Sequence, residues 1–315
     1  MDLFLLSIRL IQNKKYLVNK TNTQILEFLM NTTRTDIEFT SRGAQLRGWL
    51  YRPKGSLAAP GIVMAHGLTA VREMFLDMYA EAFAEAGFAT LAYDHFGFGA
   101  SDGKPRQSPA PSWQLEGYRD AINWLRLQAG VDADQIGIWG SSFSGGQVIM
   151  LASEILPIKC AVAQAPAFGG GPGQVSAATM SAIGEALQNG HFDKVIPAVS
   201  ESADGLGLLY PDNSYGWFTR VHKERAPSWR NEIRVGALAE PFEPIEFLPK
   251  VRIPLRLIVA PDDKLALPNE GVKVASTNPI IDTVKIAGGH FDGYETRFAE
   301  TSGHAVDWFK RHLKA

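Results

Sequence analysis

The stretch that decides the fold is Ile136-Gly-Ile-Trp-Gly-Ser-Ser-Phe-Ser-Gly-Gly146. It begins as a buried β-strand, and the apolar-rich run 147–152 that follows is typical of a helix. A sharp turn between strand and helix can push a serine clear of the sheet and expose its hydroxyl. Such a turn is crowded, so the residues two before and two after the serine must be small. Ser142, flanked by Gly140 and Ser144, meets this demand at the end of the strand. Ser144 also has small neighbours and is the alternative, although it falls in the first helical turn.

Outward from this turn, strand and helix patterns alternate along the chain. Two runs with a period of two residues, 36–40 and 45–51, predict half-exposed antiparallel strands. The expected buried strands are 61–65, 88–93, 136–139, 160–164, 255–260 and 283–287, and the expected helices are 72–86, 112–128, 147–152 and 304–313. Repeated strand–helix units place their strands in parallel. We therefore predict an α/β fold, with a mostly parallel central sheet and helices on both faces.

The alternation stops between residues 167 and 248. This interval is too rich in Leu, Trp and Phe for a disordered chain. We predict that it is a helical cap inserted into the sheet domain, called here the cap segment (167–248), with the glycine run 169–173 as its hinge. The sheet domain is then expected to comprise residues 31–166 and 249–315. Residues 1–30 are expected to form a helical extension, and we assign no chemistry to them.

Composition limits the classes of protein that this chain can represent. It has 315 residues, of which 45% are hydrophobic and 20% charged, as in a globular protein with a sizeable core. The 31 basic and 33 acidic residues give a net charge of −2, which does not favour nucleic acid or an anionic membrane as a partner. The one cysteine, Cys160, excludes an intrachain disulfide and a multi-cysteine metal site.

The first residues do not form a convincing export or membrane signal. The apolar run Leu3–Leu6 is interrupted by Arg9, and no small-x-small cleavage site follows before Lys14. The run is also far shorter than the roughly 20 apolar residues that cross a bilayer. We therefore expect a cytoplasmic protein without stable membrane insertion, for which a homodimer is compatible with the sequence.

A serine nucleophile needs a base, and an acid that orients the base. His290 lies in a glycine-flanked segment just after the last expected strand, at the sheet edge where ligands gather in such folds. Asp262 and Asp263 follow another expected strand. We choose Asp263 to accept the imidazole N–H. Asp262 is the alternative, because a shift of one residue in the loop would exchange the two.

The negative charge that develops on a substrate carbonyl needs two backbone N–H donors. We expect one from Phe143, directly after the nucleophile, and one from Leu68, in the loop after the first buried strand. His66 is expected to brace this loop. Together with Trp217 and Trp229 of the cap segment, it is our candidate for lining the substrate pocket.

These segments resemble the α/β-hydrolase superfamily over residues 36 to 315. The segments that carry the resemblance are His66-Gly67, the run from Tyr93 to Gly103, the Ser142 turn, the Asp262-Asp263 loop and Gly289-His290-Phe291. Three further stretches are similar to dienelactone-hydrolase-like esterases and to the fungal polyketide-transferase or thiohydrolase group: Val71–Phe75, Ala226–Asn231 and Gly289–Asp292. The resemblance implies a triad of Ser142, Asp263 and His290, with Leu68 and Phe143 as oxyanion donors. Dienelactone hydrolases proper carry cysteine as nucleophile, so Ser142 argues against that particular activity.

The residues predict a serine hydrolase that needs no cofactor. Ser142 would attack the carbonyl of a small-molecule ester or thioester, His290 would act as base and then as acid, and water would release the acyl group. The aromatic residues of the cap segment predict a pocket for an apolar acyl or alcohol group.

Three other functions compete with this hypothesis. In an acyltransferase, an alcohol or amine would intercept the acyl-enzyme in place of water. Metal-dependent hydrolysis would require a His-x-x-x-His or His-x-His pattern, which the sequence lacks, so we expect no metal. A non-catalytic binding module on the same fold would have no need for all three triad residue types at strand ends.

Overall fold

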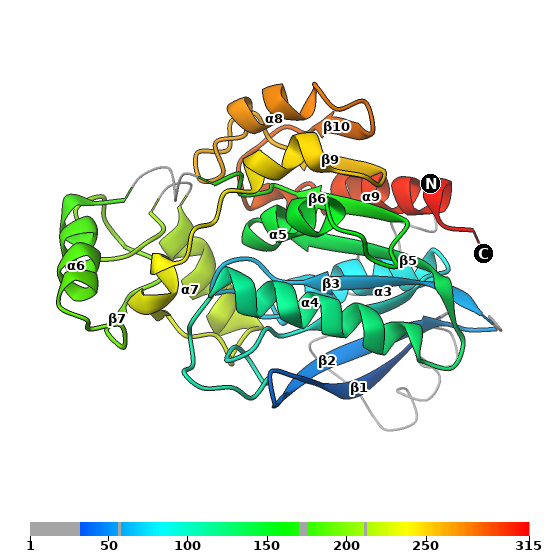
Figure 1. The fold of residues 1–315 in the computed structure, drawn as a ribbon, viewed down its shortest axis with the longest axis horizontal. Helices are drawn as coiled ribbons and strands as arrows, with labels where there is room; N and C mark the ends of the chain where they lie inside the picture. The colour runs from blue at the N-terminus through cyan, green and yellow to red at the C-terminus, as the bar shows by residue number, and fades with distance from the viewer. Residues whose placement is uncertain (1–31, 56–57, 170–174, 211–212, 315) are drawn as a thin grey trace.

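The computed structural model describes residues 32–55, 58–169, 175–210 and 213–314, and an eight-stranded sheet forms the centre of this part of the chain (Figure 1). The strands occur in the order β1-β2-β4-β3-β5-β6-β9-β10. Their bounds are Thr32–Ser41 (β1), Ala44–Pro53 (β2), Ala59–Ala65 (β3), Ala89–Tyr93 (β4), Val131–Ser141 (β5), Cys160–Gln164 (β6), Leu255–Val259 (β9) and Ile281–Lys285 (β10). Strand β2 pairs antiparallel with β1 and β4, and the remaining pairs are parallel. The prediction of a mostly parallel α/β sheet is confirmed.

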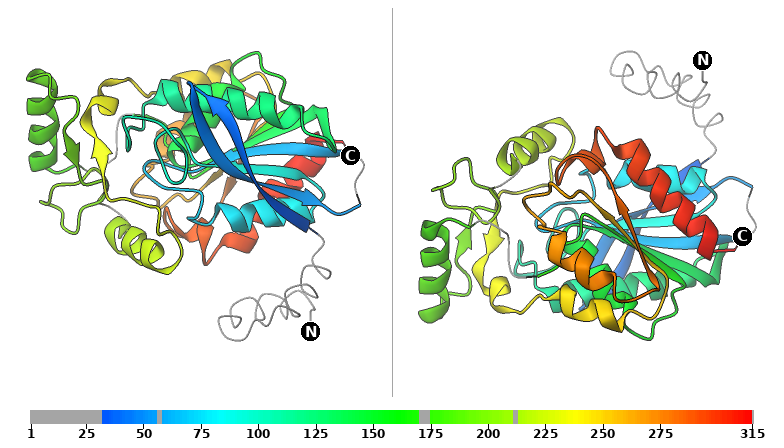
Figure 2. Two further views of the ribbon diagram at one scale, coloured as in Figure 1. Left: turned by 90° about the horizontal axis from the view of Figure 1, so that it is seen from below. Right: turned by 90° about the horizontal axis from the view of Figure 1, so that it is seen from above.

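Helices cover both faces of the sheet, as Figure 2 shows. Helices α3 (Leu76–Glu85) and α9 (Phe298–His312) pack on one face, and α4 (Pro111–Arg126), α5 (Phe143–Ala152) and α8 (Asn269–Ala275) pack on the other. The second half of strand β5, from Ile136, is buried, and this explains its apolar sequence. Trp139 packs in the core below α3 and α9, while the preceding Ile138 packs in the core below α4 and α5. A strand buried on both faces needs apolar residues at every position.

Two helices begin at residues other than those expected. The helix predicted over 72–86 begins only at Leu76, because Phe75 has a left-handed backbone conformation (φ 70°) that a right-handed helix cannot contain. The closing helix α9 begins at Phe298 instead of His304. Its first turns are held by contacts to α3 that have no local sequence signal.

The cap segment lies beyond one end of the sheet (Figure 1). Its elements are α6 (Ala177–Gln188), β7 (Val195–Ile196), α7 (Ser214–Glu224), β8 (Ile233–Arg234) and the 3-10 helices η1 (Val235–Ala239) and η2 (Pro244–Lys250). Strands β7 and β8 pair with each other, so the cap segment contains a short two-stranded sheet in addition to the expected helices. Moreover, η2 packs against α5 and α8, and its end therefore belongs with the sheet domain.

Two expectations fall outside the described residues: the helical extension over 1–30 and most of the glycine run, residues 170–173. Among the helices that the structure does describe, none has the length and apolar character needed to cross a membrane.

Candidate active site

Ser142 occupies the sharp turn between β5 and α5. Its backbone has φ 57° and ψ −120°, a conformation that costs free energy for a residue with a side chain. Hydrogen bonds hold the turn in place, since its N–H donates to Gln164 at 2.9 Å and its carbonyl accepts from Gly146 at 3.1 Å. A Cβ at position 140 would lie 2.3 Å from the backbone oxygen of Ser144, so the turn requires glycine there. The crowding expected from the sequence is present at this site.

Three side chains from separate elements form a continuous chain of hydrogen bonds, which we call the candidate triad (Ser142, His290 and Asp263). Nε2 of His290 lies 3.0 Å from Oγ of Ser142, and Nδ1 lies 2.7 Å from Oδ2 of Asp263. His290 comes from the loop after β10, and Asp263 from the loop after β9. All three therefore stand at the carboxyl ends of parallel strands, where loops from distant parts of the chain meet.

The environment of Asp263 favours its charged form. The side chain is 3% exposed, and its Oδ1 accepts two backbone hydrogen bonds, from Leu265 and Ala266, both at 2.8 Å. Burial opposes ionisation, but the charge of His290, its hydrogen bond and the two backbone donors outweigh burial and lower the pKa of Asp263. Asp262, the alternative acid, is exposed to solvent instead of facing His290.

Ser144, the alternative nucleophile, is fully buried beneath the turn. Its hydroxyl lies 2.5 Å from the carbonyl of His66, 3.0 Å from Nε2 of His95 and 3.0 Å from Oε1 of Gln147. A hydroxyl held in this way has no access to a substrate carbonyl. The Ser144 hydroxyl instead stabilises the turn through these contacts.

Two backbone N–H groups are available to an oxyanion beside Ser142. In the described part of the chain, neither the N–H of Leu68 nor that of Phe143 donates to a protein acceptor. Both residues line the same cavity as Ser142 and His290. The loop that carries Leu68 passes directly over the nucleophile. The approach is so close that a Cβ on Gly67 would lie 2.9 Å from the Cβ of Ser142.

The ring of His66 sets the direction of the Leu68 N–H. Nδ1 of His66 donates to the carbonyl of Gly67 at 3.0 Å, and Nε2 accepts from the backbone N–H of His95 at 3.2 Å. In a planar trans peptide the carbonyl and the N–H point in opposite directions. By holding the Gly67 carbonyl, His66 therefore turns the Leu68 N–H away from its own ring. The structure thus gives His66 the bracing contact that the sequence led us to expect.

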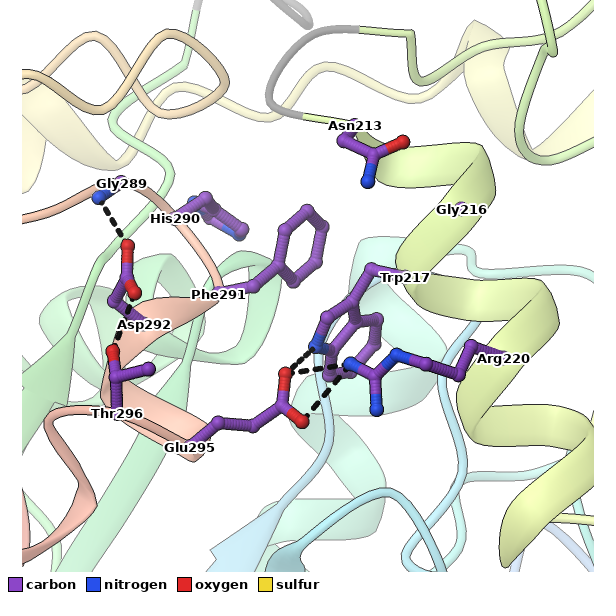
Figure 3. A pocket seen from close by; sticks show the side chains of 10 residues that line it. All are labelled: Asn213, Gly216, Trp217, Arg220, Gly289, His290, Phe291, Asp292, Glu295 and Thr296. Carbon is purple, nitrogen blue, oxygen red and sulfur yellow. Dashed lines mark hydrogen bonds and ion pairs between the residues drawn. The ribbon is translucent and has the colours of Figure 1, made fainter.

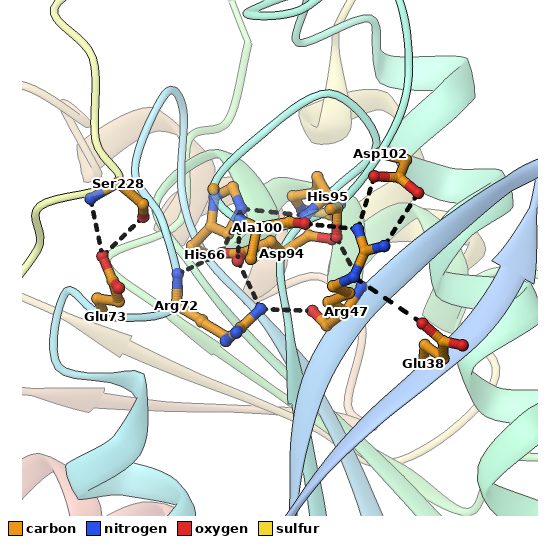
Figure 4. A network of polar contacts seen from close by, with 12 residues as sticks. Glu38, Arg47, His66, Arg72, Glu73, Asp94, His95, Ala100, Asp102 and Ser228 are labelled. Atoms are coloured by element: carbon orange, nitrogen blue, oxygen red, sulfur yellow. Dashed lines mark hydrogen bonds and ion pairs between the residues drawn. The ribbon is translucent and has the colours of Figure 1, made fainter.

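Figure 4 shows the buried polar network in which His66 lies. Asp94 accepts hydrogen bonds from the backbone and the guanidinium of Arg72, at 2.7 and 2.6 Å, and from Ala100 at 3.0 Å. Burial lowers the pKa of His66, although the charge of Asp94 acts in the opposite direction. Burial also lowers the pKa of His95, well below its ordinary range. Two neutral imidazoles therefore support the turn and the loop above it.

Comparison with known proteins agrees with this architecture. Residues 42–175 match the family described as X-Pro dipeptidyl-peptidase (S15 family). An uncharacterised 31.7 kDa protein of Escherichia coli, from the traX-finO intergenic region, is 30% identical over 273 residues, which cover 83% of this chain and 94% of that protein. The crystal structure of the α/β hydrolase GrgF from Penicillium superposes with a TM-score of 0.75 and 23% identity, over 89% of this chain and 99% of that one.

The chain belongs to the α/β-hydrolase superfamily.

Shorter matches within the superfamily cover about two fifths of the chain. The thiohydrolase aneE of Aspergillus aculeatus is 43% identical over 118 residues, which are 37% of this chain and 36% of the relative. The polyketide transferase grgF of Penicillium is 36% identical over 134 residues, or 42% and 45% of the two chains. The resemblance to the thiohydrolase and polyketide-transferase group is therefore confirmed.

Two cavities of this α/β hydrolase reach Ser142. The larger, the apolar cavity, has a volume of about 580 Å³, and a smaller one of about 20 Å³ lies between Ser142, His290 and Phe291. The apolar cavity extends from the candidate triad into the cap segment and is lined mainly by Leu68, Phe143, Val175, Met180, Ile183, Leu208, Leu209, Leu238, Phe242 and Leu265.

The pocket residues expected from the sequence divide into two groups. His66 and Trp217 line the small cavity next to Ser142. Trp229 does not reach it: the side chain is 3% exposed and stacks on Phe218, with ring centroids 5.3 Å apart. Trp229 therefore lies one layer behind the wall of this cavity, where it supports Phe218.

A third depression, which we call the polar cavity, opens on the other side of His290 (Figure 3). It measures about 540 Å³ and lies between α7 and the segment that follows β10. Its lining consists of Asn213, Gly216, Trp217, Arg220, Gly289, His290, Phe291, Asp292, Glu295 and Thr296. No local sequence pattern predicts this cavity, because its two sides are about 75 residues apart in the chain.

The described residues contain no cluster of three or more His, Cys, Asp or Glu side chains that could hold a metal ion. The one cysteine, Cys160, is buried in β6, and burial raises the pKa of its thiol far above the ordinary value. It has no contact with the candidate triad that would suggest a chemical role.

Proposed function

We propose that this protein is a serine hydrolase that cleaves carboxylic esters or thioesters through an acyl-enzyme on Ser142. The observation that carries the proposal is the hydrogen-bonded chain from Ser142 through His290 to Asp263 at the end of an apolar cavity. A serine, an imidazole and a buried carboxylate in this order convert a weak nucleophile into an effective one.

The geometry supports a two-step reaction. Oγ of Ser142 attacks the substrate carbonyl and passes its proton to Nε2 of His290, while the oxyanion accepts hydrogen bonds from the N–H groups of Leu68 and Phe143. The imidazolium then protonates the leaving alcohol or thiol, which departs and leaves an acyl-serine. In the second step water attacks the acyl carbon, His290 takes the water's proton and returns it to Ser142, and the free acid is released.

The apolar cavity suits the acyl chain of the substrate. Among the described residues that line it, the acidic side chains are those of Glu240 and Glu243, and no Lys or Arg is present. Binding of an apolar chain in this cavity is favoured because its surface is transferred out of water. An anionic chain would be repelled by the two carboxylates.

Reaction with a fluorophosphonate probe tests the nucleophile. Wild-type protein and Ser144→Ala should be labelled, whereas Ser142→Ala should not. Labelling that persists in Ser142→Ala and disappears in Ser144→Ala would move the nucleophile by two residues and refute the assignment. Hydrolysis of p-nitrophenyl esters of graded chain length tests the reaction itself. Wild-type rates no higher than those of Ser142→Ala at every length would refute an esterase.

Acyl transfer is a second candidate, favoured by the similarity to the polyketide transferase grgF. The first step would be the same, and an alcohol or amine would replace water in the second. Product analysis with a panel of alcohols and amines distinguishes the two functions. Formation of new esters or amides in proportion to acceptor concentration would support transfer, and formation of free acid alone would support hydrolysis.

A further inference from the structure

Two cavities of similar volume reach the candidate triad, and they differ in how many polar side chains line them. The apolar cavity, about 580 Å³, reaches Ser142 from the side of α6 and η1. The polar cavity, about 540 Å³, reaches His290 from the side of α7. We propose that the polar cavity binds the alcohol part of an ester whose acyl chain occupies the apolar cavity, and that this alcohol is a neutral, polyhydroxylated molecule such as glycerol or a sugar. This inference rests on the proposed hydrolase function and specifies its substrate class.

The chemistry of proton transfer places the alcohol on the side of His290. Nε2 of His290, which takes the proton of Ser142, must give it to the leaving oxygen and therefore has to lie within hydrogen-bond reach of that atom. The small cavity between Ser142 and His290 holds about 20 Å³, enough for one oxygen atom the size of water. Phe291 and Trp217 line this small cavity and the polar cavity alike. A leaving oxygen beside His290 would therefore carry the rest of the alcohol towards the polar cavity.

The polar cavity presents hydrogen-bonding groups on a firmly held wall. Arg220 of α7 reaches Glu295 with its Nη2 group at 2.7 and 2.9 Å, and Nε1 of Trp217 donates to the same carboxylate at 2.9 Å (Figure 3). A guanidinium carries five N–H donors, so Arg220 can bind Glu295 and a ligand hydroxyl together. The side chain of Asn213 extends over the same space from the start of α7.

The charges of the lining disfavour an anion, and its two carboxylates already have partners that compete with a cation. Glu295 is paired with Arg220, and Asp292 accepts hydrogen bonds from Gly289 and Thr296. Arg220 contributes one positive charge, and Asp292 and Glu295 contribute two negative charges, so the wall carries no surplus of positive charge for a phosphate or carboxylate. Carboxylate oxygens accept hydrogen bonds, while guanidinium and amide groups donate them. A hydroxyl does both and fits between them.

The ring of Phe291 completes the fit to a polyol. It is partly exposed, and Trp217, which is 6% exposed, stacks against it with ring centroids 4.4 Å apart. Rings beside hydrogen-bonding groups offer apolar surface for the C–H groups of a polyol, while its hydroxyls reach the polar side chains. An alkyl alcohol would gain only the first of these contacts.

A matched pair of esters tests the proposal: 1-octanoylglycerol and propyl octanoate, which share the acyl chain and a three-carbon alcohol and differ by two hydroxyls. We expect wild-type kcat/KM to be about tenfold higher for the glycerol ester. This ratio corresponds to the net free energy that one hydrogen bond to a charged group contributes to binding. In Arg220→Gln this preference should fall to about twofold or less, through a higher KM for the glycerol ester, with a clearly smaller loss of kcat/KM for the propyl ester.

Arg119→Gln is the matched control, because Arg119 forms a similar ion pair with Glu154, at 2.6 Å, away from both cavities. It should retain the tenfold preference. If Arg220→Gln does not fold, as judged by thermal unfolding, Arg220→Lys replaces it and should lose part of the preference.

The possible failures are distinguishable. Equal kcat/KM for the two esters in the wild type would overturn the polyol site and leave the hydrolase proposal standing. A loss in Arg220→Gln that is the same for both esters would show that Arg220 only supports the wall, and would also overturn it. Failure to hydrolyse either ester, together with no fluorophosphonate labelling, would overturn both proposals.

Discussion

Replacing Asp263 with asparagine should abolish most of the activity without disturbing the shape of the site. Oδ1 of Asp263 accepts two backbone N–H bonds, so in Asp263→Asn the amide oxygen must take this position. The amide NH₂ then faces Nδ1 of His290, which lies 2.7 Å from the present Oδ2. Nδ1 can meet a donor only as an acceptor. The ring proton is therefore forced onto Nε2, which faces Ser142 and can no longer act as its base.

The expected loss follows from this change of tautomer. A triad with its imidazole held in the wrong tautomer loses about 10⁴-fold in kcat, which is about 5 kcal/mol of activation free energy. The assay is hydrolysis of a p-nitrophenyl ester at neutral pH, with thermal unfolding recorded in parallel. KM should change little, because Asp263 lies behind His290 and does not line the cavities that reach Ser142.

The neighbouring residue supplies the control. Asp262 is exposed, so Asp262→Asn should keep kcat within about twofold of the wild type. If Asp263→Asn retained more than a tenth of wild-type kcat, the tautomer argument would be refuted. If Asp262→Asn lost the activity instead, the loop would adopt the other register during catalysis.

Three further results are expected. Gly140→Ala should greatly reduce activity and stability, because its Cβ would lie 2.3 Å from a backbone oxygen of the turn. Gly184→Ala is the control: this position of α6 is open, and the variant should stabilise the protein by about 0.5–1 kcal/mol in chemical denaturation. Burial lowers the pKa of His66 and of His95, so the unfolded chain binds protons that the folded protein does not. The free energy of unfolding should therefore fall as pH drops below about 6.5, by up to about 1.4 kcal/mol per pH unit for each ring, and pH-independent stability between pH 7.5 and 5.5 would contradict this. Ile183→Trp should narrow the apolar cavity, lowering kcat/KM for dodecanoate esters but not for acetate esters; an equal effect on both would show that the acyl chain lies elsewhere.

The folded state also distinguishes the two tryptophans that the sequence offered as pocket residues. Trp217 and Trp229 look alike in the sequence, as isolated tryptophans in an irregular segment. Trp217 stacks on Phe291 beside the candidate triad, whereas Trp229 stacks on Phe218 one layer further out. Which of two such residues faces the cavity depends on how α7 packs, and local sequence contains no information about that packing.

Local patterns in the chain were enough to predict the features that arise from local interactions. The alternation of strand and helix patterns indicated the mostly parallel sheet, and the small residues around Ser142 indicated the sharp turn, because backbone crowding acts within a few residues. Tertiary structure alone decided which of Asp262 and Asp263 faces His290, that the hydroxyl of Ser144 is held by His66 and His95, and that Arg220 meets Glu295 across a polar cavity. These contacts join segments that are far apart in the chain, and their geometry exists only once the sheet, the loops and the cap segment have packed together.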